Sequence, residues 1–273
     1  MRIALGVEYD GGCYHGWQRQ KSTDLTVQGF VEKALSKLAM HPVAVICAGR
    51  TDAGVHAFEQ VIHFDTDKKR TPHEWVFGTN AGLPADIRIT WMHAVSDDFH
   101  ARFSAAARYY RYEILNRSIK SALHRHHVTT IFQSLDEKLM QQGANQLIGT
   151  HDFTSFRAQG CQAKSPNKRI HSIVIRRSND KITLDIIANA FLHHMVRNIV
   201  GVLLPIGKAE KPPAWVSDVL DAKDRRSAGV TAPPTGLYFK GVYYPQQFGI
   251  NTLDEFRPFA EAIEINPLDK NRP

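Results

Sequence analysis

The chain has 273 residues, 43% of them hydrophobic, and a formal net charge of +7 at pH 7. This length and apolar content predict one large domain or two small ones with a real core, and they exclude a disordered or fibrous chain. No apolar stretch approaches membrane-spanning length, and Glu8 comes too early for a secretory signal peptide. The three cysteines are scattered and odd in number, which argues against a disulfide framework and favours a cytoplasmic protein.

Positive charge is concentrated in two stretches of the sequence. Residues 102–127 contain six lysines and arginines against one acid, Glu113, and residues 157–181 contain seven against Asp180. Aromatic and β-branched residues are interleaved with these charges, so we expect both stretches to lie on a folded surface. Such stretches in a basic chain are typical of proteins that bind nucleic acid.

Hydrophobic periodicity in the first hundred residues predicts a β-α-β-β-α-β succession. The expected elements are a strand over 3–9, a helix over 27–38, strands over 43–47 and 61–65, a helix from 71 to about 82, and a strand over 87–95. The second helix opens on a capping box, Thr71-Pro72-His73-Glu74, with proline at the first helical position.

The second part of the chain shows a similar succession. The expected elements are a strand over 109–115, a helix from 134 to 149, strands over 170–175 and 182–187, a helix over 191–206, a short helix after Pro212-Pro213, and a strand over 238–244. Ser134-Leu135-Asp136-Glu137 is a second candidate capping box.

These elements predict an α+β fold made of two ferredoxin-like halves. We expect the halves to join into one mixed, mostly antiparallel sheet with helices on one face and an active-site cleft between the halves. The predicted boundaries are 1–104 for the N-terminal half with the catalytic loop, 105–245 for the C-terminal half, and 246–273 for a tail.

The run 48–57 contains the residues best suited to chemistry. Arg50 and Asp52 stand two residues apart, so on extended backbone their side chains point the same way. Gly49 and Gly54 permit sharp turns and the close approach of another molecule. An exposed ion pair in an ordinary loop is the simpler alternative.

The sequence lacks the motifs that several classes of enzyme require. There is no phosphate-binding P-loop, no dinucleotide fingerprint, no zinc-deaminase signature and no nucleophile elbow. The runs 124–127 and 193–194 are rich in histidine, but neither has the ligand spacing of a metal site, so we expect no metal. A lone carboxylate suits nucleophilic attack or proton abstraction at a sugar carbon without a cofactor. Glycoside hydrolysis needs a second carboxylate, for which Asp10 or Asp65 would be the candidates.

Two further residues are candidates for such a site. Arg197 adjoins the apolar face of the helix predicted over 191–206, so it lies either at the rim or buried against an acid, where it would keep Asp52 ionised. Tyr110 shares a strand face with Tyr112. Core packing is the simplest interpretation of Tyr112, whereas Tyr110 can stack under a base and use its hydroxyl for proton transfer.

The chain resembles the tRNA pseudouridine synthase A family, within the pseudouridine synthase superfamily, over nearly its whole length. The matching segments are Tyr9-Asp10-Gly11, Gly16-Trp17-Gln18, Thr26-Val27-Gln28, residues 49–57, Asn80-Ala81-Gly82-Leu83-Pro84, residues 99–105, Phe156-Arg157-Ala158, residues 160–166, residues 191–198 and residues 232–237. Any one of these would be weak, but their number and order make the resemblance specific.

The resemblance implies isomerisation of uridine to pseudouridine at positions 38, 39 and 40 of the tRNA anticodon stem-loop, without a cofactor. It assigns Asp52 as the catalytic aspartate, which acts as nucleophile or as base. The other residues that it implies are Arg50, which helps to displace the base, Tyr110 beneath the uracil, Arg197 as the partner of the aspartate, Leu237 in the pocket, and the RNA-contacting residues Phe99, His100, Ala101, Arg102, Phe103, Gly160, Cys161, Gln162, Ala163 and Lys164.

The resemblance also implies a homodimer in which each tRNA spans both subunits. Two positions depart from the family's usual pattern: Phe58-Glu59 stands where a glycine commonly precedes Gln60, and Tyr109 stands where a basic residue is usual. The tail beyond Pro245 lies outside the matching segments and has no predicted role. A non-catalytic RNA-binding module, or a pseudouridine synthase with another RNA target, are the alternative interpretations.

Overall fold

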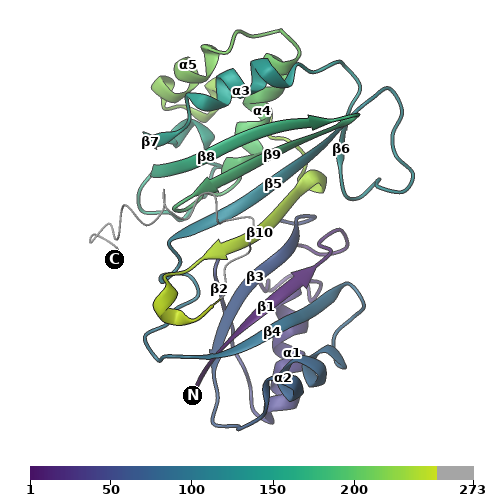
Figure 1. Ribbon diagram of the computed structural model, residues 1–273, viewed down its shortest axis with the longest axis vertical. Helices are drawn as coiled ribbons and strands as arrows, with labels where there is room; N and C mark the ends of the chain where they lie inside the picture. Colours follow the sequence, from purple (N-terminus) through teal and green to yellow (C-terminus); the bar gives the residue numbers. More distant parts are fainter. Residues whose placement is uncertain (251–273) are drawn as a thin grey trace. The chain divides into compact units, whose positions relative to one another are not determined.

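The computed structural model of the protein describes residues 1–250, which form two compact units. One unit comprises Met1–Ala107 together with the described residues from Tyr238 onward, and the other is Arg108–Leu237. Each unit is a sheet with its helices on one face (Figure 1). The last strand therefore belongs with the first unit, whereas we had expected residues 105–245 to form the second half.

The first unit contains the predicted β-α-β-β-α-β succession and one added strand. Its elements are β1 (Arg2–Tyr9), α1 (Val27–Ala39), β2 (Ile46–Cys47), β3 (His56–Asp65), α2 (Pro72–Asn80), β4 (Ile87–Val95) and β10 (Leu237–Tyr243). The strand order is β4-β1-β3-β10, with β2 paired to β3. All of these pairs are antiparallel except β3 with β10, which is parallel.

Side-chain caps fix where the helices of the first unit begin. The Thr26 side chain accepts a hydrogen bond from the Gly29 amide at the start of α1. At the start of α2, Thr71 and Glu74 form the predicted capping box, with Pro72 at the first helical position. The predicted start of α2 is confirmed. It could be predicted because its signals lie within four consecutive residues of the sequence.

The second unit repeats the pattern with more helices. Its elements are β5 (Ala107–Asn116), β6 (Thr129–Ile131), α3 (Glu137–Asn145), β7 (Gly149–Asp152), β8 (Asn167–Ser178), β9 (Lys181–Ala188), α4 (Met195–Gly207) and α5 (Trp215–Ala222). The strand order is β5-β9-β8-β7, all antiparallel, and β6 pairs with β5 in parallel. The predicted α+β class and the mixed, mostly antiparallel pairing are confirmed. The joining of the halves into one sheet and the cleft between them stay predictions.

Some predicted boundaries were wrong, each for a local reason. The cap of α3 is Asp136, whose carboxylate accepts from the Lys138 and Leu139 amides, so the capping box predicted at Ser134 does not form. Helix α4 begins at Met195 because His194 has a left-handed backbone, with φ of 61°, which a right-handed helix cannot include. The short strands β6 and β7 were missed because they are too brief to show a period.

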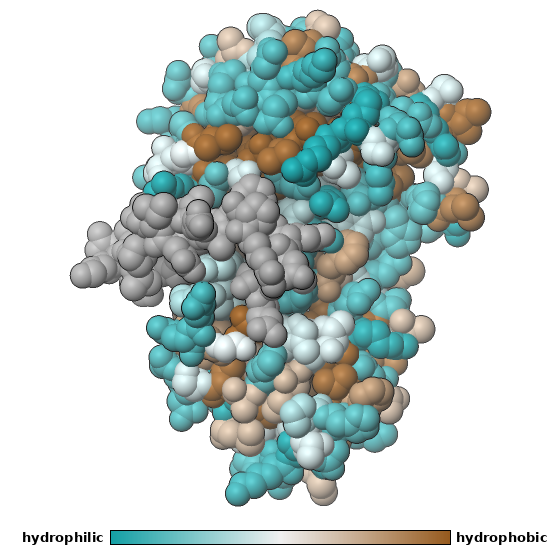
Figure 2. Space-filling model, viewed as in Figure 1, coloured by the Kyte–Doolittle hydropathy of each residue, from teal (hydrophilic) through white to brown (hydrophobic). Residues whose placement is uncertain are grey.

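Two further features complete the description. Within residues 1–250, no helix combines the length and the apolar character that crossing a bilayer requires. Residues 246–248 of the predicted tail form a short 3-10 turn, and the Phe248 ring packs edge-on against Phe99 with centroids 5.2 Å apart. The remainder of that tail, from residue 251, lies outside the described residues. Hydrophilic side chains cover most of the face in Figure 2, with hydrophobic patches in both units.

Candidate active site

The loop that carries Arg50 and Asp52 connects β2 to β3 and is fastened at its base by a buried glutamine. The Ala48 amide donates to the Val61 carbonyl at 2.8 Å, which continues the strand pairing into the loop. Next to it, the Gln60 side chain accepts from the Gly49 amide at 3.3 Å and donates to the Gly49 carbonyl. Gln60 is fully buried, so this paired contact fixes the point at which the loop leaves the sheet.

Residues 9–17 hold the same loop from the other side. The Tyr9 hydroxyl lies 2.7 Å from the Thr51 hydroxyl, and the Trp17 amide donates to the Thr51 carbonyl at 3.1 Å. The Gly54 amide donates to the Tyr14 carbonyl at 3.3 Å. Burial raises the pKa of Tyr9, so its hydroxyl keeps its proton. The residue before Asp52 is therefore fixed by both backbone and side-chain contacts.

Two glycines let these segments approach closely. Gly16 has φ of +92°, and a β-carbon there would lie 2.7 Å from the Thr51 carbonyl oxygen. A β-carbon at Gly11 would overlap the Val55 carbonyl. Only glycine fits at either position, which explains why both occur in the segments that carry the family resemblance.

The loop presents its two functional side chains differently. Arg50 is exposed, whereas Asp52 is half-buried. Such an arrangement leaves the guanidinium accessible to a macromolecule and the carboxylate partly shielded from water. The predicted shared orientation of these side chains stays a prediction.

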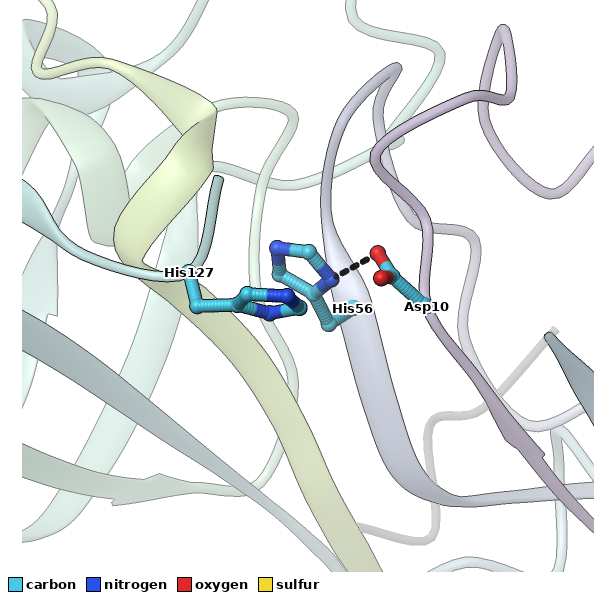
Figure 3. A group of neighbouring side chains, drawn as sticks. All are labelled: Asp10, His56 and His127. Atoms are coloured by element: carbon cyan, nitrogen blue, oxygen red, sulfur yellow. Dashed lines mark ion pairs between the residues drawn. The ribbon is translucent and has the colours of Figure 1, made fainter. Parts of the chain in front are cut away.

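Each of the two other candidate carboxylates has a basic side chain as its partner. Asp10 forms an ion pair with His56, Oδ1 to Nδ1 at 2.8 Å (Figure 3). Asp65 ends the ten-residue strand β3 and binds Arg2 through two hydrogen bonds of 2.9 Å. Because β3 starts just after the loop, Asp65 lies about 30 Å along the strand from it. Asp65 is therefore too distant to serve as a second carboxylate, and the hydrolytic alternative keeps Asp10 as its candidate.

The predicted RNA-contacting segment 99–103 divides into buried anchors and exposed groups. Phe99 and Ala101 are fully buried, and the Tyr244 hydroxyl donates to the Ala101 carbonyl at 2.6 Å. Arg102 is exposed, and the Phe103 side chain is 50% exposed, with the Arg102 guanidinium carbon 5.5 Å from its ring centroid. This part of the segment offers a cation and an aromatic face together.

Two histidines shape this segment as hydrogen-bond acceptors. His100 Nδ1 accepts from the Arg102 and Phe103 amides at 3.2 and 3.1 Å, and His63 Nδ1 accepts from the Ala101 amide at 3.1 Å. Burial lowers the pKa of His63 to about 4 and also lowers the pKa of His100. Both rings therefore stay neutral near pH 7 and keep the lone pair that each bond needs.

In the second unit, the two tyrosines on β5 differ in their surroundings, and the role of Tyr110 in base stacking stays a prediction. The Tyr112 hydroxyl donates to the Pro233 carbonyl at 2.8 Å and lies 2.7 Å from the Thr129 hydroxyl, and its ring is fully buried. Tyr112 is thus a core residue, as we predicted. Tyr110 is 9% exposed and packs edge-on against Phe191, with ring centroids 4.9 Å apart.

Arg197 is hydrogen-bonded to Ala232, which begins the segment 232–237 that ends at Leu237. The Arg197 side chain donates from Nε to the Ala232 carbonyl at 2.8 Å, and the Ala232 amide donates back to the Arg197 carbonyl at 3.1 Å. The segment then reaches Leu237, which is 5% exposed at the start of β10. The pairing of Arg197 with Asp52 stays a prediction.

A residue that our prediction did not include holds the second RNA-contacting segment, 160–164. The Arg157 guanidinium donates to the carbonyls of Cys161 and Ala163, the latter at 3.0 Å. Gly160, Gln162 and Lys164 are exposed, while Cys161 and Ala163 are half-buried. Arg157 stands beside the segment in the sequence, but its inward role depends on loop geometry that no local pattern reveals.

The structure thus assigns Arg50, Asp52 and segment 99–103 to the first unit, and it assigns Tyr110, Arg197, Leu237 and segment 160–164 to the second. The structure also identifies side chains that hold these segments in place: Gln60, His63, His100 and Arg157. Of these, the sequence predicted only His100 as a site residue, and it did so as an RNA contact.

Comparisons with known proteins identify the family of this chain. A family model described as tRNA pseudouridine synthase matches residues 6–104 and 144–245. The tRNA pseudouridine synthase A of Methylococcus capsulatus is 54% identical over 273 residues, covering 99% of this chain and 100% of the relative. The enzyme of the same name from Coxiella burnetii is 57% identical over 247 residues, covering 90% and 94%. The one from Colwellia psychrerythraea is 54% identical over 248 residues, covering 91% and 95%. The chain is therefore a member of the tRNA pseudouridine synthase family, whose members are isomerases.

Proposed function

We propose that this protein isomerises uridine to pseudouridine at positions 38, 39 and 40 in the anticodon stem-loop of tRNA, with Asp52 as the catalytic residue. The observation that carries the proposal is the loop 48–55. It holds one half-buried carboxylate on a backbone fastened from two sides, and it leaves the neighbouring Arg50 exposed. A rigid carboxylate of this kind suits a reaction that requires a precisely oriented oxygen at one ribose carbon.

The reaction rearranges bonds without net addition or loss of atoms. The C1′–N1 glycosidic bond breaks, the uracil rotates, and C5 bonds to C1′. The hydrogen on C5 is lost to solvent, and N1 gains a proton. Asp52 either attacks C1′ or removes a proton from C2′. Because substrate and product are isomers, no redox or group-transfer cofactor enters the balance.

The other site residues take roles that fit their exposure. The target base is stacked in the RNA, so it must leave the stack at a cost of about a few kcal/mol. The exposed Arg50 is suited to fill the space that the base vacates. Tyr110, Arg197 and Leu237 are assigned to the uracil pocket, where Arg197 keeps Asp52 ionised. The exposed residues of the two segments assigned to RNA contact include Arg102, Phe103 and Lys164.

We further propose that the enzyme works as a cytoplasmic homodimer, with each tRNA bound across both subunits. The net charge of +7 supports binding of a polyanion of this size. Light scattering of the purified protein tests the assembly, since a monomer mass at working concentrations would contradict it.

The decisive experiment measures tritium released from tRNA labelled at uracil C5. We expect release by the natural protein, and a loss of at least 10³-fold in Asp52→Ala, which removes the reacting oxygen. Asp24→Ala, an exposed aspartate in the same unit, serves as the matched control and should release tritium at the natural rate. Equal release by Asp52→Ala would refute its catalytic role. Intact tRNA binding with no release by the natural protein would instead favour a non-catalytic RNA-binding module.

A further inference from the structure

The loop 117–127, which we call the basic arm, connects β5 to β6 in the second unit. Strands β5 and β6 pair in parallel, Ile114 with Thr129 and Asn116 with Ile131, so the chain must turn back between them. Parallel neighbours are usually joined through a helix. Here the connection contains none, and it is long for a loop inside a compact unit. Loops of this kind usually have a function of their own.

The basic arm is ordered by contacts within itself. Arg117 Nε donates to the Ile119 carbonyl at 2.7 Å, and Arg125 Nη1 donates to the Ala122 carbonyl at 2.9 Å. The buried Ser121 hydroxyl accepts from the His124 amide at 3.0 Å. These bonds give the backbone of the arm a defined path, from which its exposed side chains project.

The charge of the basic arm has one sign. No aspartate or glutamate occurs between Glu113 and Asp136 in the sequence. The exposed cations are Arg117, Lys120 and Arg125, and none of them forms an ion pair with another described residue. A cluster of exposed cations without counter-charges is the pattern that phosphate groups neutralise.

Two large apolar side chains stand among these cations. Ile119 is 73% exposed and Leu123 is 86% exposed. The loop projects beside β6 in Figure 1, and hydrophobic side chains stand among hydrophilic ones on that edge in Figure 2. Apolar side chains flanked by cations are what proteins use to touch bases or riboses between two phosphates.

We propose that the basic arm is an RNA-binding element additional to the catalytic loop and to segments 99–103 and 160–164. Lys120 and Arg125 contact backbone phosphates, and Leu123 packs against a base or ribose. The proposal rests on the proposed function. The charge of the arm alone would also fit an acidic protein surface, and we choose RNA as its partner because the proposed substrate is tRNA.

The first test asks whether the positive charges of the basic arm contribute to tRNA binding. The dissociation constant for tRNA is measured against salt concentration for Lys120→Gln, Arg125→Gln and the double variant. Each lost phosphate contact should lower the slope of log Kd against log salt by about 1 and weaken binding roughly three- to tenfold near 0.15 M salt. Lys120 makes no internal hydrogen bond in the arm, so its variant leaves the loop geometry intact.

The matched control is Lys138→Gln, an exposed lysine on α3 in the same unit, which should bind with the natural slope. Leu123→Ser should weaken binding severalfold with an unchanged slope, because it removes no charge. In all of these variants the rate of tritium release at saturating tRNA should stay natural. Natural slopes and affinities in the three charge variants would overturn the proposal.

This experiment also distinguishes the two proposals. If the natural protein releases no tritium while the charge variants still lose tRNA affinity, the function is wrong and the basic arm stands. If release is normal and the variants bind as the natural protein does, the function stands and the basic arm is wrong.

Discussion

Both units place helices on one face of a sheet, but they accommodate a carboxyl group removed from water in opposite ways. In the first unit, the Trp91 side chain lies against Gly6 and hydrogen-bonds to Glu59. Burial raises the pKa of Glu59 to about 7, so half of these carboxyls are protonated at neutral pH. The first unit therefore accommodates a half-buried acid by favouring its neutral form.

In the second unit, a carboxylate on β9 lies at the centre of a charge network. Asp185 is 8% exposed and accepts from Arg111 at 2.7 and 3.1 Å, from Tyr109 at 2.6 Å and from Arg176 at 3.4 Å. A carboxylate removed from water must either take up a proton or find partners. The comparison shows a carboxyl whose neutral form is favoured in the first unit, and a carboxylate surrounded by hydrogen-bond donors in the second.

The largest expected effect comes from removing the centre of the charge network. Asp185→Ala leaves the Arg111 guanidinium and the Tyr109 hydroxyl partly buried without their acceptor. We expect the free energy of unfolding to fall by about 3–5 kcal/mol, measured by chemical denaturation. Asp221→Ala, at an exposed position on α5, is the control and should change it by less than about 0.5 kcal/mol. A loss below about 1 kcal/mol in Asp185→Ala would mean that the network contributes little.

The second expected effect depends on pH. The folded-state pKa of Glu59 lies above the ordinary glutamate value of 4.5, so stability linked to its proton is complete below pH 4.5 and is lost as pH rises through about 7. Glu59→Gln removes the charge that burial penalises. The variant should therefore be more stable than the natural protein by about 2–3 kcal/mol at pH 8.5.

The same variant should match the natural protein at pH 4.5, where Glu59 is protonated in the folded state. Unfolding titrations at both values of pH give the comparison. Glu8→Gln, at an exposed glutamate on β1, should show no such pH-dependent gain. An equal gain at both values would point to packing rather than to the charge.

The smallest effect tests a single bond of the charge network. Tyr109→Phe removes the hydroxyl that donates to Asp185 and accepts from Arg111 at 3.0 Å. We expect a loss of about 1 kcal/mol in unfolding free energy. In the Asp185→Ala background the same change should cost clearly less, because the two residues share one interaction. Additive losses would show that Tyr109 acts by packing alone.

Much of the fold could be predicted because its signals are local. The alternation of apolar residues in β1 and β4 and the capping box at Thr71 each lie within one element. The same local reasoning was wrong at α3, where Asp136 caps the helix two residues after the expected Ser134. Two capping residues stood two positions apart in the sequence, and only the surrounding fold selects between them.

The support of the candidate site was less predictable, because its contacts join distant residues. Gln60 meets Gly49, and His63 meets Ala101 across 38 residues. The two departures from the family's usual residues were visible in the sequence, but their reasons were not. In the structure, the Glu59 carboxyl interacts with the Trp91 side chain, and the Tyr109 hydroxyl donates a hydrogen bond to Asp185.

The position of β10 has a consequence for the order in which the chain is made. This strand pairs with β3, Tyr238 beside His56, although the whole second unit separates them in the sequence. At ribosomal speeds of about 5–20 residues per second, the first unit waits roughly 7–25 seconds for its last strand. During that interval the β3 edge that receives β10 has no such partner to cover it, so the half of the chain that is synthesised first is the half that is completed last.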